Sequence, residues 1–274
     1  MKHTFLSALA AAAAIFAAGC SDISENDRYI LTEGIEPQRA VLIEDFTGQN
    51  CLNCPNAHET IEKLAEQYGD AVIPVSIHAG ALAYAVDDFF NTVIYGTCLK
   101  QPEGDTYNDE WGIVAWPQGV INRTGGARNH DDWAGAVRTE MTKAAPVDIT
   151  VSASCPAGAS DVAISVSLAP LENIDGKLQL WILEDGITAV QRMPDGKNNT
   201  EYVHNHVYRA SVNGVGGERI VLAEGIHTDL DYSIELRDNQ YESWVPENLS
   251  VVAFVYTADD GVLQAAKARV STTE

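Results

Sequence analysis

Basic residues are scarce in this chain of 274 residues. It contains 17 Lys and Arg against 39 Asp and Glu, which gives a formal net charge of −22. Proteins that hold nucleic acids neutralise phosphates with clustered Lys and Arg, which this chain lacks. We therefore expect no nucleic-acid partner. The acidic excess favours solubility outside the cytoplasm and carries no information on the fold.

The N-terminal region lacks an apolar run long enough to span a bilayer, which takes about 20 residues. Its uncharged run at residues 5–18 is shorter, and the small residues Ala17-Ala18-Gly19 then precede Cys20. This pattern is typical of bacterial lipoprotein processing. We predict a signal peptide at residues 1–19, a lipidated Cys20 and a flexible tether at residues 20–37. Cleavage by the ordinary signal peptidase, giving a soluble periplasmic protein, is the alternative.

Cysteine is also sparse, with five in the chain. If Cys20 is lipidated, four remain, and an even number outside the cytoplasm permits disulfides. We predict a disulfide between Cys51 and Cys54. Cys98 and Cys155 could form a second bridge, or could remain as two buried thiols.

Patterns that bind metals are incomplete. Structural zinc normally takes four ligands in paired motifs, and Cys51-x-x-Cys54 has no second Cys-x-x-Cys to accompany it. His58 could join the two cysteines, and strand alternation would bring His204 and His206 onto one face. Neither set has a visible full complement of ligands. We therefore predict no metal and no cofactor.

The Cys-x-x-Cys lies between a strand pattern and a helix pattern. The apolar run at residues 40–46 predicts a strand, the next pattern predicts a helix that ends at Gly69, and residues 71–78 predict a second strand. These elements form a β-α-β unit. The first sulfur then lies near unpaired N–H groups at a helix N-terminus, which favour a thiolate. Cys51 is the predicted nucleophile and Cys54 the resolving thiol.

Asp45 six residues before the first cysteine, Cys51-x-x-Cys54 itself and the later Trp116-Pro117 together resemble the thioredoxin family. The resemblance implies thiol-disulfide exchange with protein or small-molecule disulfides. Asp45 would accept or return a proton, Pro117 would be a cis-proline that faces the disulfide, and the backbone of Trp116 would pair with substrate. Without the resemblance, Asp45 is a solvated strand-end carboxylate and Pro117 an ordinary trans proline.

The chain departs from the thioredoxin pattern in three places. Asn50 replaces a Trp, Leu52-Asn53 replaces Gly-Pro, and an insertion covers residues 79–115. Apolar residues from Val86 to Ile94 predict a packing helix in the insertion, which could also shape a substrate groove. The dipeptide between the cysteines tunes the redox potential, so the direction of electron flow and the redox partner stay open.

Beyond Pro146 the helical patterns give way to short alternating runs broken by turns, which predict an all-β sandwich of immunoglobulin-like type. The predicted strands are residues 147–153, 162–168, 178–183, 202–212, 219–223, 232–236, 251–256 and 262–270. The predicted fold class is an α/β thioredoxin-like domain at residues 38–145, followed by a β-sandwich domain at residues 146–274.

The lipoprotein start, residues 44–48, residues 117–123 and residues 204–209 together resemble the outer membrane protein 28 family of Bacteroidota lipoproteins. The resemblance extends over about residues 38–270. It implies anchoring in the outer membrane through Cys20, on the periplasmic or the cell-surface face.

The sequence supports two functions. The first is an outer-membrane-anchored thiol-disulfide oxidoreductase that uses Cys51 and Cys54. The second is a non-enzymatic surface binding or assembly protein in which the same pair is a structural disulfide on a thioredoxin scaffold. One fold hosts many functions, so the fold does not separate them. A reachable, easily reduced disulfide would indicate the enzyme, and a buried, stable one would indicate the scaffold.

Overall fold

The computed structural model of the chain describes residues 38–83, 98–238 and 242–273. The predicted signal peptide, the predicted lipid site Cys20 and the predicted tether lie outside these residues. The packing helix predicted between Val86 and Ile94 lies outside them as well.

The first two strands and the first helix form where the sequence predicts them. β1 (Val41–Thr47) and β2 (Val72–His78) are buried along their whole length and pair in parallel, as their continuous apolar runs favour. α1 (Cys54–Tyr68) connects them. It ends at Gly69, whose φ of 55° is a backbone conformation that favours glycine.

Two more helices and a hairpin complete the first half of the chain. β3 (Gln118–Ile121) runs antiparallel to β1, and β4 (Thr124–Arg128) pairs with β3. α3 (Trp133–Met141) follows. α2 (Pro102–Glu110) lies in the predicted insertion, and the sequence does not predict it because Tyr107 is its one large apolar residue. Short 3-10 helices occupy Gly69–Ala71, Gly80–Leu82, His130–Asp132 and Pro246–Asn248.

The second half of the described chain is built of strands, as predicted. They are β5 (Val147–Ser154), β6 (Asp161–Pro170), β7 (Ile174–Glu184), β8 (Ile187–Arg192), β9 (Asn198–His204), β10 (Val207–Ser211), β11 (Glu218–Leu222), β12 (Thr228–Glu235), β13 (Leu249–Thr257) and β14 (Gly261–Ser271). The single strand predicted at residues 202–212 is interrupted at His206, where φ is 57°. β8 was missed, and it pairs with β9 as a separate two-stranded sheet.

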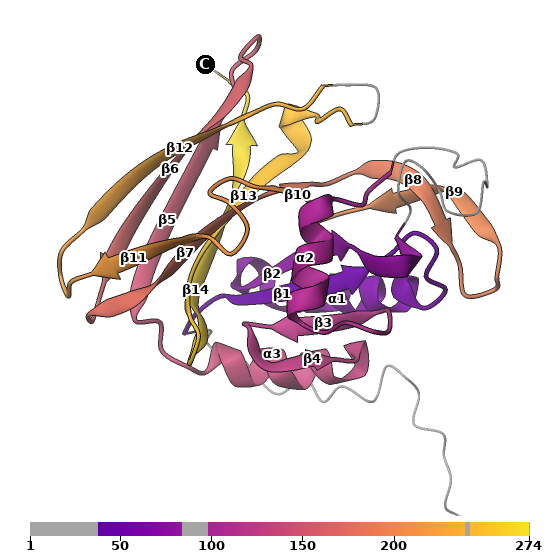
Figure 1. Cartoon of the computed structure of the whole chain (residues 1–274), viewed down its shortest axis with the longest axis horizontal. Coiled ribbons are helices and arrows are strands. Elements are labelled where there is room, and N and C mark those ends of the chain that lie inside the picture. The colour runs from indigo at the N-terminus through magenta and orange to yellow at the C-terminus, as the bar shows by residue number, and fades with distance from the viewer. Residues whose placement is uncertain (1–37, 84–97, 239–241, 274) are drawn as a thin grey trace, which may run out of the picture. The chain divides into compact units, whose positions relative to one another are not determined.

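The predicted fold class is wrong. The chain is mostly β, and the strands other than β8 and β9 form one large mixed sheet of twelve strands, in place of an α/β thioredoxin-like domain and a separate immunoglobulin-like sandwich. β10 joins the two halves (Figure 1), because it pairs with β7 on one side and with β2 on the other. The N–H of Ser76 donates to the carbonyl of His206 at 2.8 Å. Such pairing between distant segments leaves no local periodicity in the sequence.

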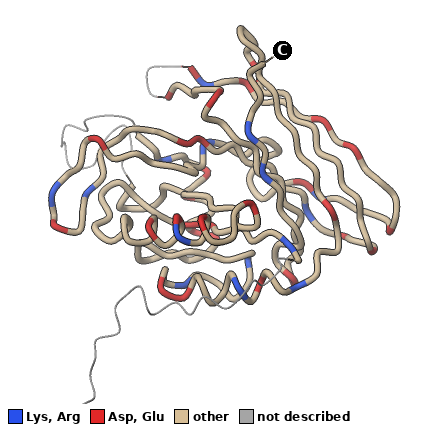
Figure 2. The backbone as a smooth tube through the Cα atoms, turned by 180° about the vertical axis from the view of Figure 1, so that it is seen from behind, with Lys and Arg blue, Asp and Glu red and all other residues tan. Residues whose placement is uncertain are grey.

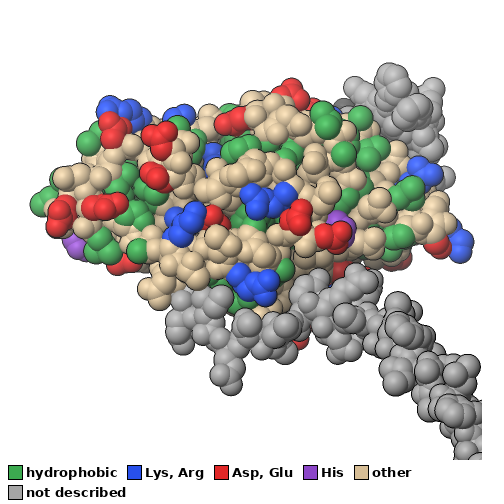
Figure 3. Space-filling view, turned by 90° about the horizontal axis from the view of Figure 1, so that it is seen from below, with side chains coloured by type: hydrophobic (Ala, Val, Ile, Leu, Met, Phe, Trp, Pro, Cys, Tyr) green, Lys and Arg blue, Asp and Glu red, His purple; other side chains and the backbone are tan. Residues whose placement is uncertain are grey.

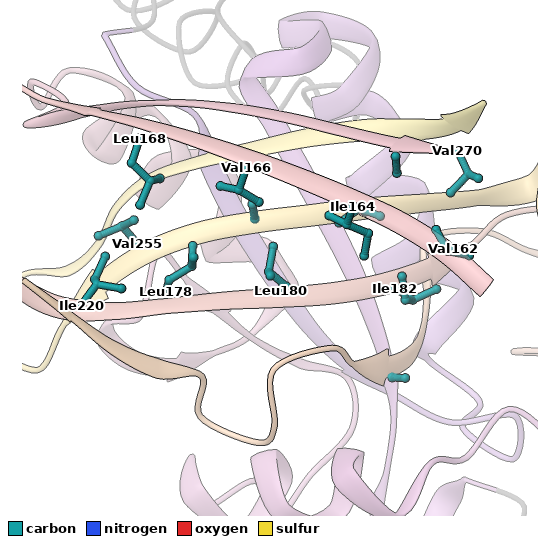
Figure 4. Close-up of a cluster of buried hydrophobic side chains, with 14 of the residues drawn as sticks. Val162, Ile164, Val166, Leu168, Leu178, Leu180, Ile182, Ile220, Val255 and Val270 are labelled. Atoms are coloured by element: carbon teal, nitrogen blue, oxygen red, sulfur yellow. The ribbon is translucent and has the colours of Figure 1, made fainter. Parts of the chain in front are cut away.

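Alternating apolar residues of the second half enclose a core between facing strands. Side chains of β6 point toward those of β7 in Figure 4, namely Val162, Ile164, Val166 and Leu168 on one side and Leu178, Leu180 and Ile182 on the other. The opposite face of β6 is largely exposed, as a period of two requires. Burial of this core therefore accounts for the register of these strands.

A second core lies across the boundary predicted at residue 146. Leu42 and Ile77 from the first half pack in the same cluster as Trp181 and Phe254 from the second. All four side chains are at most 2% exposed. The predicted division into two domains stays a prediction, but the halves share apolar contacts that neither could bury alone.

A buried ion pair lies at the centre of this shared core. Arg123 donates to both carboxylate oxygens of Glu44, at 2.8 and 3.2 Å. Glu44 is on β1, and Arg123 is in the turn between β3 and β4, with φ of 56°. The guanidinium also lies 4.5–5.9 Å from the ring centroids of Tyr107, Trp181, Phe254 and Tyr256. These rings come from α2, β7 and β13, so one cation contacts four elements besides its own turn.

Acidic residues are spread over most elements of the fold (Figure 2). The face in Figure 3 carries basic side chains beside acidic ones, with small apolar patches between them. This face has no purely basic area of the kind that phosphate backbones require. Among the described residues, no helix combines the length and the apolar character that crossing a membrane would need.

Replacing Arg123 by Leu is expected to lower the free energy of unfolding by about 3–5 kcal/mol, because Glu44 would remain buried without its partner. The matched control is Arg219→Leu, which removes an exposed two-bond pair with Asp175 and should have little effect. Urea unfolding with the disulfide intact measures both variants. Equal losses would contradict a central role for the buried pair.

Candidate functional site

Cys51 and Cys54 form a disulfide, as the sequence predicts. Their Cα atoms are 5.4 Å apart, and Cys54 is the first residue of α1. The N–H of Cys54 donates to the sulfur of Cys51 at 3.1 Å. The sulfur of Cys51 therefore lies at the start of the helix, as the sequence predicts. A thiolate at this position would be stabilised by the helix N–H groups.

Both cysteines are enclosed. Cys51 is 1% exposed and Cys54 is 0% exposed. β8, far along the chain, contacts this loop: the side-chain amide of Gln191 donates to the carbonyls of Gly48 and Cys51 at 3.3 and 3.0 Å. The N–H of Arg192 donates to the Gln49 carbonyl at 2.7 Å. The loop that carries the disulfide is thus fixed by a strand that sequence analysis missed.

Asp45 is a buried carboxyl group, not the solvated strand-end carboxylate that the sequence alone allowed. Its side chain is 0% exposed, and neither oxygen has a hydrogen-bond partner among the described residues. Burial raises the pKa of Asp45 to about 8. His58 Nε2 lies 3.6 Å from Asp45 Oδ2, and burial lowers the pKa of His58 to about 3. At neutral pH both groups are therefore uncharged.

The Trp116–Pro117 bond is cis. The Trp116 ring packs against Gly80 so closely that a Cβ atom there would lie 2.1 Å from the ring, so glycine is required at that position. Pro117 is buried, and Trp116 is half-buried against the shared core. The predicted roles of Trp116 and Pro117 toward a substrate stay predictions.

The second bridge that the cysteine count allowed does not form. Cys98 and Cys155 both remain thiols. Burial raises the pKa of each thiol, so neither has the lowered pKa of a reactive cysteine. Of the two possibilities that the sequence left open for Cys98 and Cys155, the structure contains two thiols and not a second disulfide.

Histidines that are distant in the sequence meet beside the disulfide loop. His58 on α1 bonds to Tyr202 Oη at 2.8 Å and to Thr47 Oγ1 at 3.1 Å. The His204 ring lies 6.4 Å from the His58 ring and 5.3 Å from the His78 ring, between centroids. The sequence gives separate local patterns for His58 and His204 and none for His78, since no local pattern links a residue of β2 to one of β9.

The family comparison identifies the chain. A family model described as "Outer membrane protein Omp28" matches residues 104–274, which is more than half of the sequence. The chain belongs to the Omp28 family. This confirms the predicted resemblance and the predicted outer-membrane lipoprotein location. A search of curated proteins finds no match.

One solved structure supports the architecture of this Omp28-family protein, and a second is similar over part of the chain. HBP35 of Porphyromonas gingivalis is similar over 86% of this chain and 77% of its own, with 17% identity and a TM-score of 0.66. A domain of the outer membrane lipoprotein Omp28 from the same organism covers 48% of this chain and 93% of its own, with 24% identity and a TM-score of 0.36. At these identities the likeness to HBP35 shows the fold alone.

Replacing Asp45 by Asn is expected to stabilise the protein increasingly as pH rises from 4 to 8. The folded carboxyl group keeps its proton up to about pH 8, whereas the unfolded one releases it near pH 4, so the wild type loses stability across this window. Asn removes that loss, which at roughly 1.4 kcal/mol per pKa unit amounts to at most about 6 kcal/mol.

Urea unfolding at a series of pH values tests this expectation. The Asp45→Asn and wild-type curves should converge at pH 4 and separate toward pH 8. The control Asp148→Asn, at an exposed position of β5, should follow the wild type. A constant difference between Asp45→Asn and wild type at all pH values would show that Asp45 does not titrate as its burial requires.

Proposed function

We propose that this Omp28-family protein is a non-enzymatic binding or assembly protein of the outer membrane, and that its Cys51–Cys54 disulfide is a structural cross-link. The observation that carries this proposal is the enclosure of both cysteines, which are at most 1% exposed. Thiol-disulfide exchange begins with a thiolate that reaches one sulfur, and β8 lies over this loop. The disulfide then serves to hold the loop between β1 and α1.

A cleft lined in part by Arg123 and Tyr256, which lie in the shared core, could hold a ligand. It has a volume of 520 Å³, within the range of about 300–1,000 Å³ that small-molecule sites occupy. Trp111 and Tyr256 supply aromatic surface, while Lys177, Arg219 and Glu110 supply charges of both signs. Such a lining suits a partly apolar ligand that carries polar groups.

Thiol-disulfide exchange is the second candidate, and a specific observation favours it. The Cys54 N–H that donates to the Cys51 sulfur would stabilise a Cys51 thiolate, and the buried, protonated Asp45 could donate its proton and then take one back as the carboxylate. In that reaction the Cys51 thiolate attacks a substrate disulfide and releases one substrate thiol. Cys54 then displaces the second substrate thiol, and the protein is left with its own disulfide. The backbone beside Trp116 and Pro117 would hold the substrate.

The reduction potential of Cys51–Cys54 separates the two candidates. The mature protein is equilibrated in thiol-disulfide buffers, then alkylated and analysed by peptide mass. A potential below about −300 mV is expected, because structural disulfides resist reduction by cellular thiols. A potential well above about −300 mV would overturn the structural role and support exchange.

Replacing Gln191 by Ala is expected to speed reduction of the disulfide by dithiothreitol by on the order of tenfold, because two hydrogen bonds that hold the loop are lost. Gln67→Ala, at an exposed position of α1, is the control and should reduce at the wild-type rate. Thiol release under limiting dithiothreitol gives both rates. If Gln191→Ala and Gln67→Ala are equally fast, β8 does not control access to the sulfurs.

A further inference from the structure

Large apolar side chains stand exposed at one end of the second half of the chain. Leu171 is 59% exposed, Val221 is 67% exposed and Ile226 is 62% exposed. Leu171 lies in the turn between β6 and β7, Val221 lies on β11, and Ile226 lies in the connection from β11 to β12. These three residues are called the apolar tip below.

Backbone hydrogen bonds bring the segments of the apolar tip together. The N–H of Gly225 donates to the carbonyl of Pro170 at 2.9 Å, so the next residues along the chain, Ile226 and Leu171, are neighbours. The β6–β7 turn and the β11–β12 connection accordingly lie beside each other at the lower left of Figure 1.

Val221 belongs to the same end of the molecule. β11 pairs with the start of β7, directly after the turn that carries Leu171. Its neighbours Ile220 and Leu222 are buried in the core of the second half, so the side chain of Val221 points to the opposite, outer face of the strand. Exposed apolar residues that gather in this way are typical of interaction surfaces.

The described part of the chain begins near the apolar tip. The N–H of Gln38 donates to the carbonyl of Met141 at 2.8 Å, and the N–H of Leu171 donates to the carbonyl of Pro146 at 2.8 Å. Met141 and Pro146 are five residues apart, which is at most about 18 Å of chain. The predicted tether therefore joins the protein at the end that carries the apolar tip.

The length of the tether restricts what the apolar tip can meet. The protein is an outer membrane lipoprotein, with its lipid predicted on Cys20 and the tether predicted at residues 20–37. The ends of a flexible linker of this length are on average roughly 23 Å apart. The anchor thus holds the apolar tip close to the bilayer, where even a weak contact is favoured by the high effective concentration.

Charges around the apolar tip select the kind of lipid. Glu172 and Glu224 are exposed next to Leu171 and Ile226, and the whole chain has a formal net charge of −22. Acidic groups are repelled by anionic headgroups, so attraction to such lipids cannot supply the contact. Burial of aliphatic side chains at the interface of an uncharged lipid surface can.

We propose that the apolar tip is a lipid-contact surface, which lies against zwitterionic headgroups of the membrane that holds the anchor and inserts Leu171, Val221 and Ile226 between them. The contact would fix the orientation of the folded part relative to the membrane. It uses neither the Cys51–Cys54 disulfide nor the ligand cleft, so it goes beyond the proposed binding function and does not depend on it.

Photochemical crosslinking in vesicles tests the proposal. The mature lipidated protein, with p-benzoylphenylalanine in place of Ile226, is reconstituted in phosphatidylcholine vesicles. The control carries the same group in place of Val203, which is 51% exposed on β9. One tether holds both positions near the bilayer, so a difference between them reports contact. We expect at least about fivefold more lipid adduct at position 226, because an inserted side chain lies among lipids. Replacing half of the lipid by phosphatidylglycerol at low salt should lower this adduct at least about twofold.

Hydrogen exchange of the wild type tests the same contact without a substituted tip. Amides of residues 221–227 should exchange at least about threefold more slowly in the lipidated protein on phosphatidylcholine vesicles than in Cys20→Ser, which carries no lipid, because the contact excludes water. Amides of residues 198–204 should exchange alike in both. The proposal is overturned if positions 226 and 203 give equal lipid adducts, if position 226 crosslinks to a second copy of the chain in place of lipid, if phosphatidylglycerol raises the adduct, if the purified protein carries no lipid on Cys20, or if residues 221–227 exchange alike in both forms.

Discussion

The buried ion pair between Glu44 and Arg123 is the interaction on which the arrangement of the two halves depends. Removing two charges from water is costly, and the cost is offset only when both partners are fully engaged. Both Glu44 oxygens accept from Arg123, and four aromatic rings of α2, β7 and β13 surround the guanidinium. The β3–β4 turn that carries Arg123 is tied to β1 as well, because Asn122 Oδ1 accepts from the N–H of Leu42 at 2.7 Å. A shift of either half would separate the cation from its anion or from its rings.

This fixed arrangement explains why the surroundings of the disulfide are composite. The β8–β9 hairpin lies against the first half, where Gln191 holds the disulfide loop and His204 joins His58 and His78. Local sequence around the cysteines supplies the disulfide and the helix N–H that would favour a thiolate. The loop that carries them is hydrogen-bonded to Gln191, 140 positions away in the chain. The disulfide and its surroundings therefore come from different parts of the chain, and the burial of both cysteines is what supports the proposed structural role.

Much of the local structure could be predicted. The apolar run before the cysteines, the helical pattern after them and Gly69 gave β1, α1 and the end of α1 within one or two residues. Asp45 was found by its spacing from Cys51, and the cis bond before Pro117 by family resemblance. The misses have physical causes: α2 has one large apolar residue, and the separation of β9 from β10 depends on the backbone of one residue, His206.

The sequence by itself determined β1, α1, β2 and most strands of the second half, the cysteine pair and the membership of the Omp28 family. It also predicts the export signal. These features depend on short-range periodicity, spacing and residue type. The tertiary structure decided the rest. It joined two predicted domains into one sheet through β2 and β10, left Cys98 and Cys155 as thiols, buried Asp45, and placed His78 beside His204. These outcomes depend on which distant surfaces exclude water together, and burial of that kind leaves no mark on neighbouring residues in the sequence.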